Sequence, residues 1–127
     1  MVTLARSTRP EVGGTVLLRW LDDLRVATVL RHRDGSHLDL HIPGCPDHAL
    51  RSVGTGAYSG WRQVFVAAQD RPDRPWRRGG RWSVWRHSPQ PRRVADGLRR
   101  GSALALQRQL HEYEATALNH QRRRASA

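Results

Sequence analysis

The dipeptide Asp34-Gly35 stands between two stretches rich in apolar and β-branched residues, and it constrains the fold more than any other feature of the chain. A two-residue type I′ turn needs positive φ at both positions, and this dipeptide is one of its preferred sequences. Residues 24–33 and 36–42 are therefore predicted to form an antiparallel hairpin. In that register His32 lies opposite His37.

This register divides the hairpin into an apolar and a polar face, because alternate residues of a strand point to opposite sides. The apolar face is the predicted core face and carries Ala27, Val29, Arg31, Leu38, Leu40 and Ile42. The polar face carries Thr28, Leu30, His32, His37, Asp39 and His41.

Three further strands are predicted at residues 15–21, 61–68 and 81–87. Residues 43–60 contain two prolines and four glycines and are expected to form a long loop. Pro89 and Pro91 are expected to end the last strand.

The C-terminal part is predicted to be a helix that begins near Ser102, a suitable N-cap. Its apolar residues recur at steps of three and four, at Ala103, Leu106, Leu110, Tyr113 and Ala117. The expected fold is α+β, with a four- to five-stranded antiparallel sheet or small barrel followed by one long C-terminal helix. We expect a flexible arm over residues 1–14, a single basic domain over 15–121 and a basic tail over 122–127.

The 22 basic residues are all arginine, which excludes lysine-dependent chemistry and a P-loop. A bias toward GC-rich codons explains this usage, so we expect a GC-rich bacterium or its phage as the source. Codon bias does not explain why basic residues outnumber the 11 acidic residues twofold, to a net charge of +11. Residues 61–110 hold twelve arginines and three acidic residues, whereas residues 1–60 hold seven and six. A concentrated excess of this kind is typical of a binding surface.

The length of 127 residues suits one domain with one modest core. Cys45 is the only cysteine, so an internal disulfide is excluded and a reducing compartment is expected. No stretch resembles a signal peptide or a membrane span. We therefore expect a cytoplasmic protein that does not bind membranes.

Residues 71–93 combine eight arginines with three tryptophans and a single acidic residue. Arginine binds phosphates and guanine edges, and tryptophan can stack on unpaired bases. We place Trp82 and Val84 in the core and Trp85 on the binding face. The predicted nucleic-acid-binding residues are Arg71, Arg74, Trp76, Arg77, Arg78, Arg81, Trp85, His87, Arg92 and Arg93.

The polar face of the hairpin suggests two further chemistries. His32, His37 and Asp39 could converge on a metal ion, but His37 and His41 lie about 13 Å apart on an extended strand. The same three histidines, His32, His37 and His41, could supply an acid and a base to a metal-independent ribonuclease. The alternative, which we prefer for both, is a solvent-facing polar strand surface, and no cofactor is expected.

The leading hypothesis is a nucleic-acid-binding protein, for DNA or RNA, that contacts mainly the phosphate backbone. One alternative is an assembly or adaptor protein, such as a phage structural component, that docks through its basic face and through helix 103–121, as a homodimer or with another protein. A second alternative is the small ribonuclease. No residue is marked as a nucleophile, so a binding protein is expected rather than an enzyme.

Overall fold

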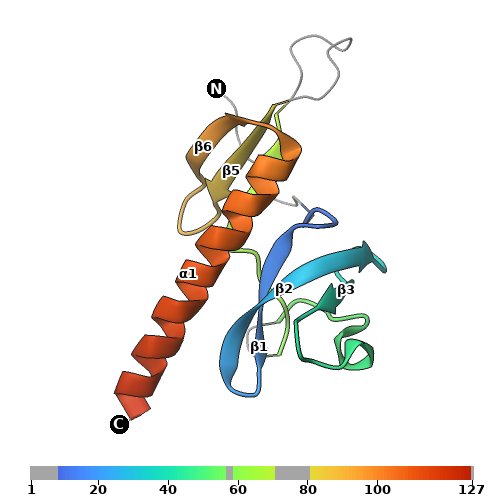
Figure 1. Ribbon diagram of the computed structural model, residues 1–127, viewed down its shortest axis with the longest axis vertical. Coiled ribbons are helices and arrows are strands. Elements are labelled where there is room, and N and C mark those ends of the chain that lie inside the picture. Colours follow the sequence, from blue (N-terminus) through green and yellow to red (C-terminus); the bar gives the residue numbers. More distant parts are fainter. Residues whose placement is uncertain (1–8, 57–58, 71–80, 127) are drawn as a thin grey trace.

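The computed structural model describes residues 9–56, 59–70 and 81–126 (Figure 1). The elements follow the chain as β1 (Thr15–Trp20), β2 (Asp23–His32), β3 (Leu38–His41), a 3-10 helix η1 (Asp47–Leu50), β4 (Phe65–Gln69), β5 (Trp82–Arg86), β6 (Arg92–Leu98) and α1 (Arg100–Ser126). In this part of the chain, no helix combines the length and the apolar character needed to cross a membrane.

The strands form two three-stranded antiparallel sheets, in the orders β1-β2-β3 and β4-β5-β6. The α+β class and the long C-terminal helix are confirmed, whereas the single sheet of four to five strands is wrong. An isolated bridge between Leu17 and Arg62 joins β1 to the residues before β4. The first half of α1 lies beside the second sheet and its second half beside β1 and β2 (Figure 1).

The core of the first sheet follows the predicted alternation of apolar residues. It contains Val16, Leu18, Ala27, Val29, Leu38, Leu40, Ile42 and Leu50. Arg31, which was expected on this face, is exposed, because a bulge between Val29 and Arg31 shifts the alternation of β2.

The predicted register of the β2–β3 hairpin is wrong, because His32 pairs with Leu38 and not with His37. Neither Asp34 nor Gly35 adopts the left-handed φ of a type I′ turn. Asp34 Oδ1 instead accepts hydrogen bonds from the backbone N–H groups of Ser36 and His37, each at 3.2 Å. This side-chain bonding stabilises a wider turn. Two consecutive residues with positive φ instead form the turn of the β1–β2 hairpin, at Leu21 (φ 50°) and Asp22 (φ 71°).

A sixth strand, β6, lies where the sequence predicted that the sheet would end. Pro89 lies in the turn after β5 and Pro91 immediately precedes β6, so neither proline removes a donor from the strand itself. β6 pairs with β5 and forms the outer edge of the second sheet.

The buried line of α1 is offset from the predicted apolar stripe, since Tyr113 is 78 % exposed and Ala117 is also exposed. The line runs through residues four apart, which are Ala103, Gln107, His111 and Ala115. The half-buried residues Leu104, Leu106, Leu110 and Leu118 flank it.

Gln107 and His111 bridge the two sheets through hydrogen bonds to Thr15 of β1 and Phe65 of β4. Gln107 Oε1 accepts from the N–H of Thr15 at 3.0 Å, and Gln107 Nε2 donates to the carbonyl of Phe65 at 2.7 Å. His111 Nε2 accepts from the N–H of Phe65 at 3.0 Å, so the proton of the neutral ring is on Nδ1, which donates to Thr15 Oγ1 at 2.7 Å. These four contacts satisfy groups of β1 and β4 that would otherwise be buried without partners.

The predicted terminal segments are in part ordered elements of the domain. Residues 9–14 of the expected arm are described, and backbone hydrogen bonds join Gly13 and Gly14 to Val29. The helix continues to Ser126, and Arg122 and Arg123 form ion pairs with Asp23 at 2.7 and 2.9 Å. Residues 1–8 and 127 lie outside the described residues.

Candidate nucleic-acid interface

Residues 81–100 cover β5, β6 and the start of α1, and they hold six arginines and one acidic residue, Asp96. We call the arginines the β5–β6 arginine edge: Arg81, Arg86, Arg92, Arg93, Arg99 and Arg100. Because β6 is the outer strand and most of its residues are exposed, this part of the sheet faces solvent.

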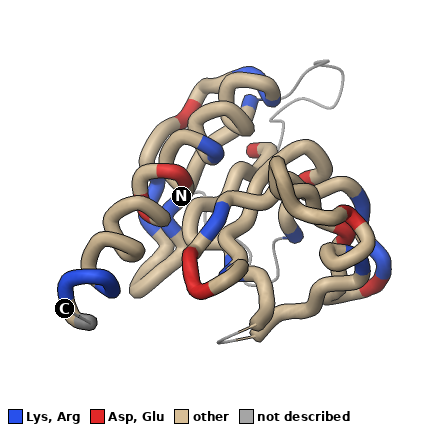
Figure 2. Tube along the Cα trace, turned by 60° about the horizontal axis from the view of Figure 1, so that its bottom comes forward, with Lys and Arg blue, Asp and Glu red and all other residues tan. Residues whose placement is uncertain are grey.

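The strand register separates the edge into two ends. Arg86 lies directly opposite Arg92, whereas the pairing of Trp82 with Leu98 places Arg81 and Arg99 at the other end. Figure 2 shows basic positions where α1 begins and a separate basic group at its C-terminal end. The arginines of the edge therefore form a group at each end of β6, and Asp96 lies between the two groups.

Three arginines of the edge are held by both an aromatic ring and a carboxylate. Arg86, Arg93 and Arg100 lie over the rings of Phe65, Trp85 and Trp82 at 5.2, 5.0 and 5.7 Å from the ring centroids. Arg86 also pairs with Glu114 at 3.3 Å, Arg93 with Asp96 at 3.2 Å, and Arg100 with Glu11 at 3.8 Å. These contacts orient the guanidinium groups and partly neutralise them.

The other three arginines, Arg81, Arg92 and Arg99, are exposed and form no ion pair with a carboxylate among the described residues. Like charges directly opposite each other on two strands destabilise a sheet, and Arg92 faces Arg86 in this way. An anionic ligand bound across this pair would remove the repulsion. The edge thus has the charge and the exposure of an anion-binding surface.

The structure describes five of the ten residues predicted to bind nucleic acid. Arg71, Arg74, Trp76, Arg77 and Arg78 lie outside the described residues. Arg81, His87, Arg92 and Arg93 are exposed on β5, on β6 or beside them. Arg86, Arg99 and Arg100 were not among the predicted residues, because Arg86 shares the predicted face of the core residues Trp82 and Val84 along its strand and because β6 was not recognised from the sequence.

The expectation that Trp85 lies open on the binding face is wrong. Its side chain is 6 % exposed, and the Arg93 guanidinium covers the ring. Trp82 and Val84 are buried against α1, as predicted. Trp85 therefore orients an arginine and does not offer a free surface to a base.

The three histidines of the hairpin do not share a site. His32 donates to the carbonyl of Pro10 at 2.6 Å, since a carbonyl can only accept. His37 bonds to Asp34 at 2.7 Å and His41 to Asp47 at 2.9 Å. The described residues contain no group of three His, Cys, Asp or Glu side chains that could hold a metal ion. The ribonuclease alternative gains no support from these separate arrangements.

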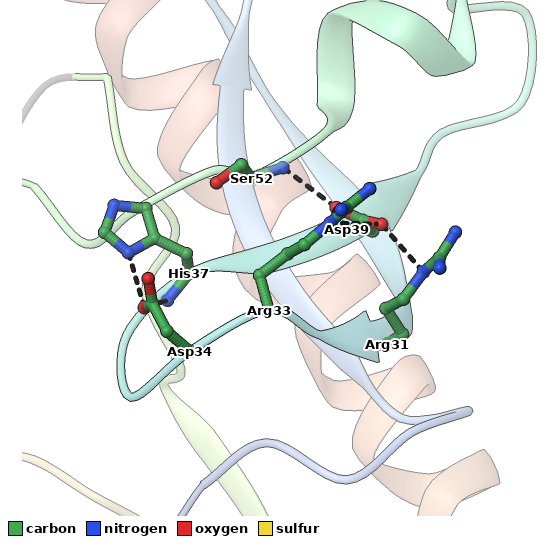
Figure 3. A network of polar contacts seen from close by, with 6 residues as sticks. All are labelled: Arg31, Arg33, Asp34, His37, Asp39 and Ser52. Carbon is green, nitrogen blue, oxygen red and sulfur yellow. Dashed lines mark hydrogen bonds and ion pairs between the residues drawn. The ribbon is translucent and has the colours of Figure 1, made fainter.

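Asp39, the third candidate metal ligand, is buried in a structural ion-pair network (Figure 3). Both of its oxygens accept from Arg33 Nε, and Oδ1 also accepts from the backbone N–H of Ser52 at 2.9 Å. Arg31 Nε lies 2.9 Å from Oδ2. These partners lower the pKa of Asp39 to about 2, with the Arg33 hydrogen bond as the largest cause. The carboxylate joins β2, β3 and the loop after η1.

Comparison with protein-family models, curated proteins and solved structures found no match for the chain. The geometry and charge of the arginine edge are therefore the basis for assigning a function.

Proposed function

We propose that this protein binds nucleic acid and contacts the phosphate backbone through the β5–β6 arginine edge. The observation that carries the proposal is the set of six arginines over two neighbouring strands and the start of α1, of which Arg81, Arg92 and Arg99 have no carboxylate partner among the described residues. A solvated surface needs no such local excess, because mixed charges keep a protein soluble. Binding to a polyanion does require such a local excess of positive charge.

The two groups of arginines have different tasks in this proposal. Arg86, Arg93 and Arg100 are oriented by aromatic rings, so they position the backbone with little loss of side-chain entropy. Arg81, Arg92 and Arg99 supply charge that no described carboxylate neutralises. Contacts to phosphate position a nucleic acid and carry no direct sequence information. Binding is accordingly expected to depend on salt and to be nearly independent of sequence.

The test compares two double variants with the same change in net charge. Arg92→Ala with Arg99→Ala removes charge from both ends of the edge. Arg25→Ala with Arg51→Ala removes exposed charge from β2 and from the end of η1, away from the edge. Each phosphate contact contributes about −0.9 to the slope of log K against log salt on duplex DNA. The first variant should flatten that slope by about 1.8 and weaken all sequences equally, whereas the control should bind nearly as the wild type does.

The readout is fluorescence anisotropy at several salt concentrations, with protein purified free of nucleic acid. Equal weakening by both variants would mean that only net charge matters and would contradict a localised site. No binding by the wild type at low salt would reject the proposed function.

One observation favours a second candidate, a protein that docks through its helix. Tyr113 is 78 % exposed on α1, and exposed aromatic residues are enriched at protein interfaces. Light scattering on protein free of nucleic acid separates the two. A monomer that binds nucleic acid favours the arginine edge, whereas an oligomer that Tyr113→Ala dissociates favours the helix.

A further inference from the structure

We infer that the nucleic acid bound by the arginine edge is double-stranded. This inference rests on the proposed function and adds the class of ligand. It is based on the burial of the aromatic rings beside the edge and on the positions of the arginines at the two ends of β6.

The aromatic rings next to the arginine edge are closed to bases. Phe65, Trp82 and Trp85 are each 6 % exposed, and a guanidinium lies over each ring at 5.0 to 5.7 Å from its centroid. Phe65 and Trp82 also pack in the core cluster beneath α1. Proteins that bind single strands gain much of their affinity from bases stacked on open aromatic rings. These three residues do not provide that contribution.

Where the described rings beside the edge do not stack on bases, the affinity that the arginine edge supplies depends on the density of phosphate charge. A duplex carries one charge per about 1.7 Å of its axis, twice the density of one of its strands. A higher density of phosphate charge attracts more strongly the three arginines without a described carboxylate partner, which are Arg81, Arg92 and Arg99. The same surface should therefore bind a duplex more tightly than a single strand of equal length.

The spacing of the edge also suits a duplex. The two ends of β6 pair with Arg86 and Trp82, which are four residues apart on β5. At about 3.3 Å per residue the two ends of the edge are therefore about 13 Å apart. The major groove of B-form DNA is about 12 Å wide, so a contact area of this length can reach phosphates on both strands. The paired β5 and β6 hold the two ends at a fixed separation, which matches a stiff ligand better than a flexible one.

The experiment titrates the full chain with labelled 20-nucleotide probes at one salt concentration. The probes are duplex DNA, duplex RNA, and single strands of DNA and RNA whose sequences cannot pair with themselves. At least one duplex should bind at least tenfold more tightly than the corresponding single strand. Arg92→Ala with Arg99→Ala should reduce that ratio, whereas Arg25→Ala with Arg51→Ala should preserve it.

The outcomes separate the inference from the proposed function. Single strands that bind as tightly as duplexes would overturn the inference and leave nucleic-acid binding in place. Failure of all four probes would overturn both. The two duplex probes identify the source, because a preference for one of them assigns the ligand to DNA or to RNA.

Discussion

Acidification from pH 7 to pH 4 should destabilise this protein through His111. The side chain is fully buried, and burial lowers the pKa of His111 from 6.5 to about 4. Its Nε2 accepts the N–H of Phe65, and a proton on that nitrogen would abolish the acceptor. The folded state therefore holds the neutral ring at pH values where the unfolded chain binds a proton.

The magnitude follows from the difference between the two pKa values. The stabilisation is complete above pH 6.5 and is lost progressively as the pH falls from 6.5 to 4. Below pH 4 both states are protonated and the loss stops growing. At 1.36 kcal/mol per pH unit, the total is about 3 kcal/mol. A loss of this size is a large part of the 5 to 15 kcal/mol that is typical of a folded domain.

The assay is urea unfolding at pH 7, 6, 5 and 4 for the wild type and for His111→Leu. At pH 7 the variant should be about 1 to 3 kcal/mol less stable, because the buried N–H of Phe65 loses its acceptor. Because only the wild type loses about 3 kcal/mol on acidification, the variant should be at least as stable as the wild type at pH 4. His120→Leu removes an exposed histidine from the same helix and is the matched control. A deficit for His111→Leu that stays constant across the pH range would refute the reasoning.

Three further predictions concern the contacts that join the helix and loops to the sheets. Asn119→Ala should cost about 1 to 3 kcal/mol of unfolding free energy in urea, because this amide bonds to both backbone groups of one β2 residue, whereas the exposed Gln121→Ala should change little. Gly14→Ala should lower the melting temperature, because the added Cβ would lie 2.8 Å from Gln107 Oε1. Gly101→Ala should raise it, because the added Cβ meets no atom within 4 Å and alanine favours the helix. Asp39→Asn should reduce stability at pH 7. Because the folded pKa of Asp39, about 2, lies below its unfolded value, that difference should disappear as the pH falls from about 4 toward 2, and a difference that persists at pH 2 would argue against the ion pairs as its cause.

The hydrophobic alternation of the first sheet was predictable because it depends only on neighbours in the sequence. Leu38, Leu40 and Ile42 are buried as expected, and so are Ala27 and Val29. The identity of the two-residue turn was not predictable from dipeptide preference. Asp34 bonds to the next two backbone N–H groups and forms a wider turn, and the left-handed pair occurs at the less typical Leu21-Asp22.

The candidate site was predictable as a charged region but not as a surface. The excess of arginine over residues 61–110 is a property of the sequence. The burial of Trp85 depends on its strand lying between β4 and β6, and the two prolines before β6 concealed that strand. Without β6, the direct pairing of Arg86 with Arg92 could not be foreseen.

The amino-acid sequence by itself determined the α+β class, the apolar face of the β2–β3 hairpin and the concentration of arginine in the second half of the chain. Composition and local periodicity are sufficient for these features, because each depends on residues that are close in the chain. Only the tertiary structure decided that the strands divide into two sheets and that Gln107 and His111 are buried between them. Backbone groups of β1 and β4 need hydrogen-bond partners there, and that need exists only after the two sheets have come together.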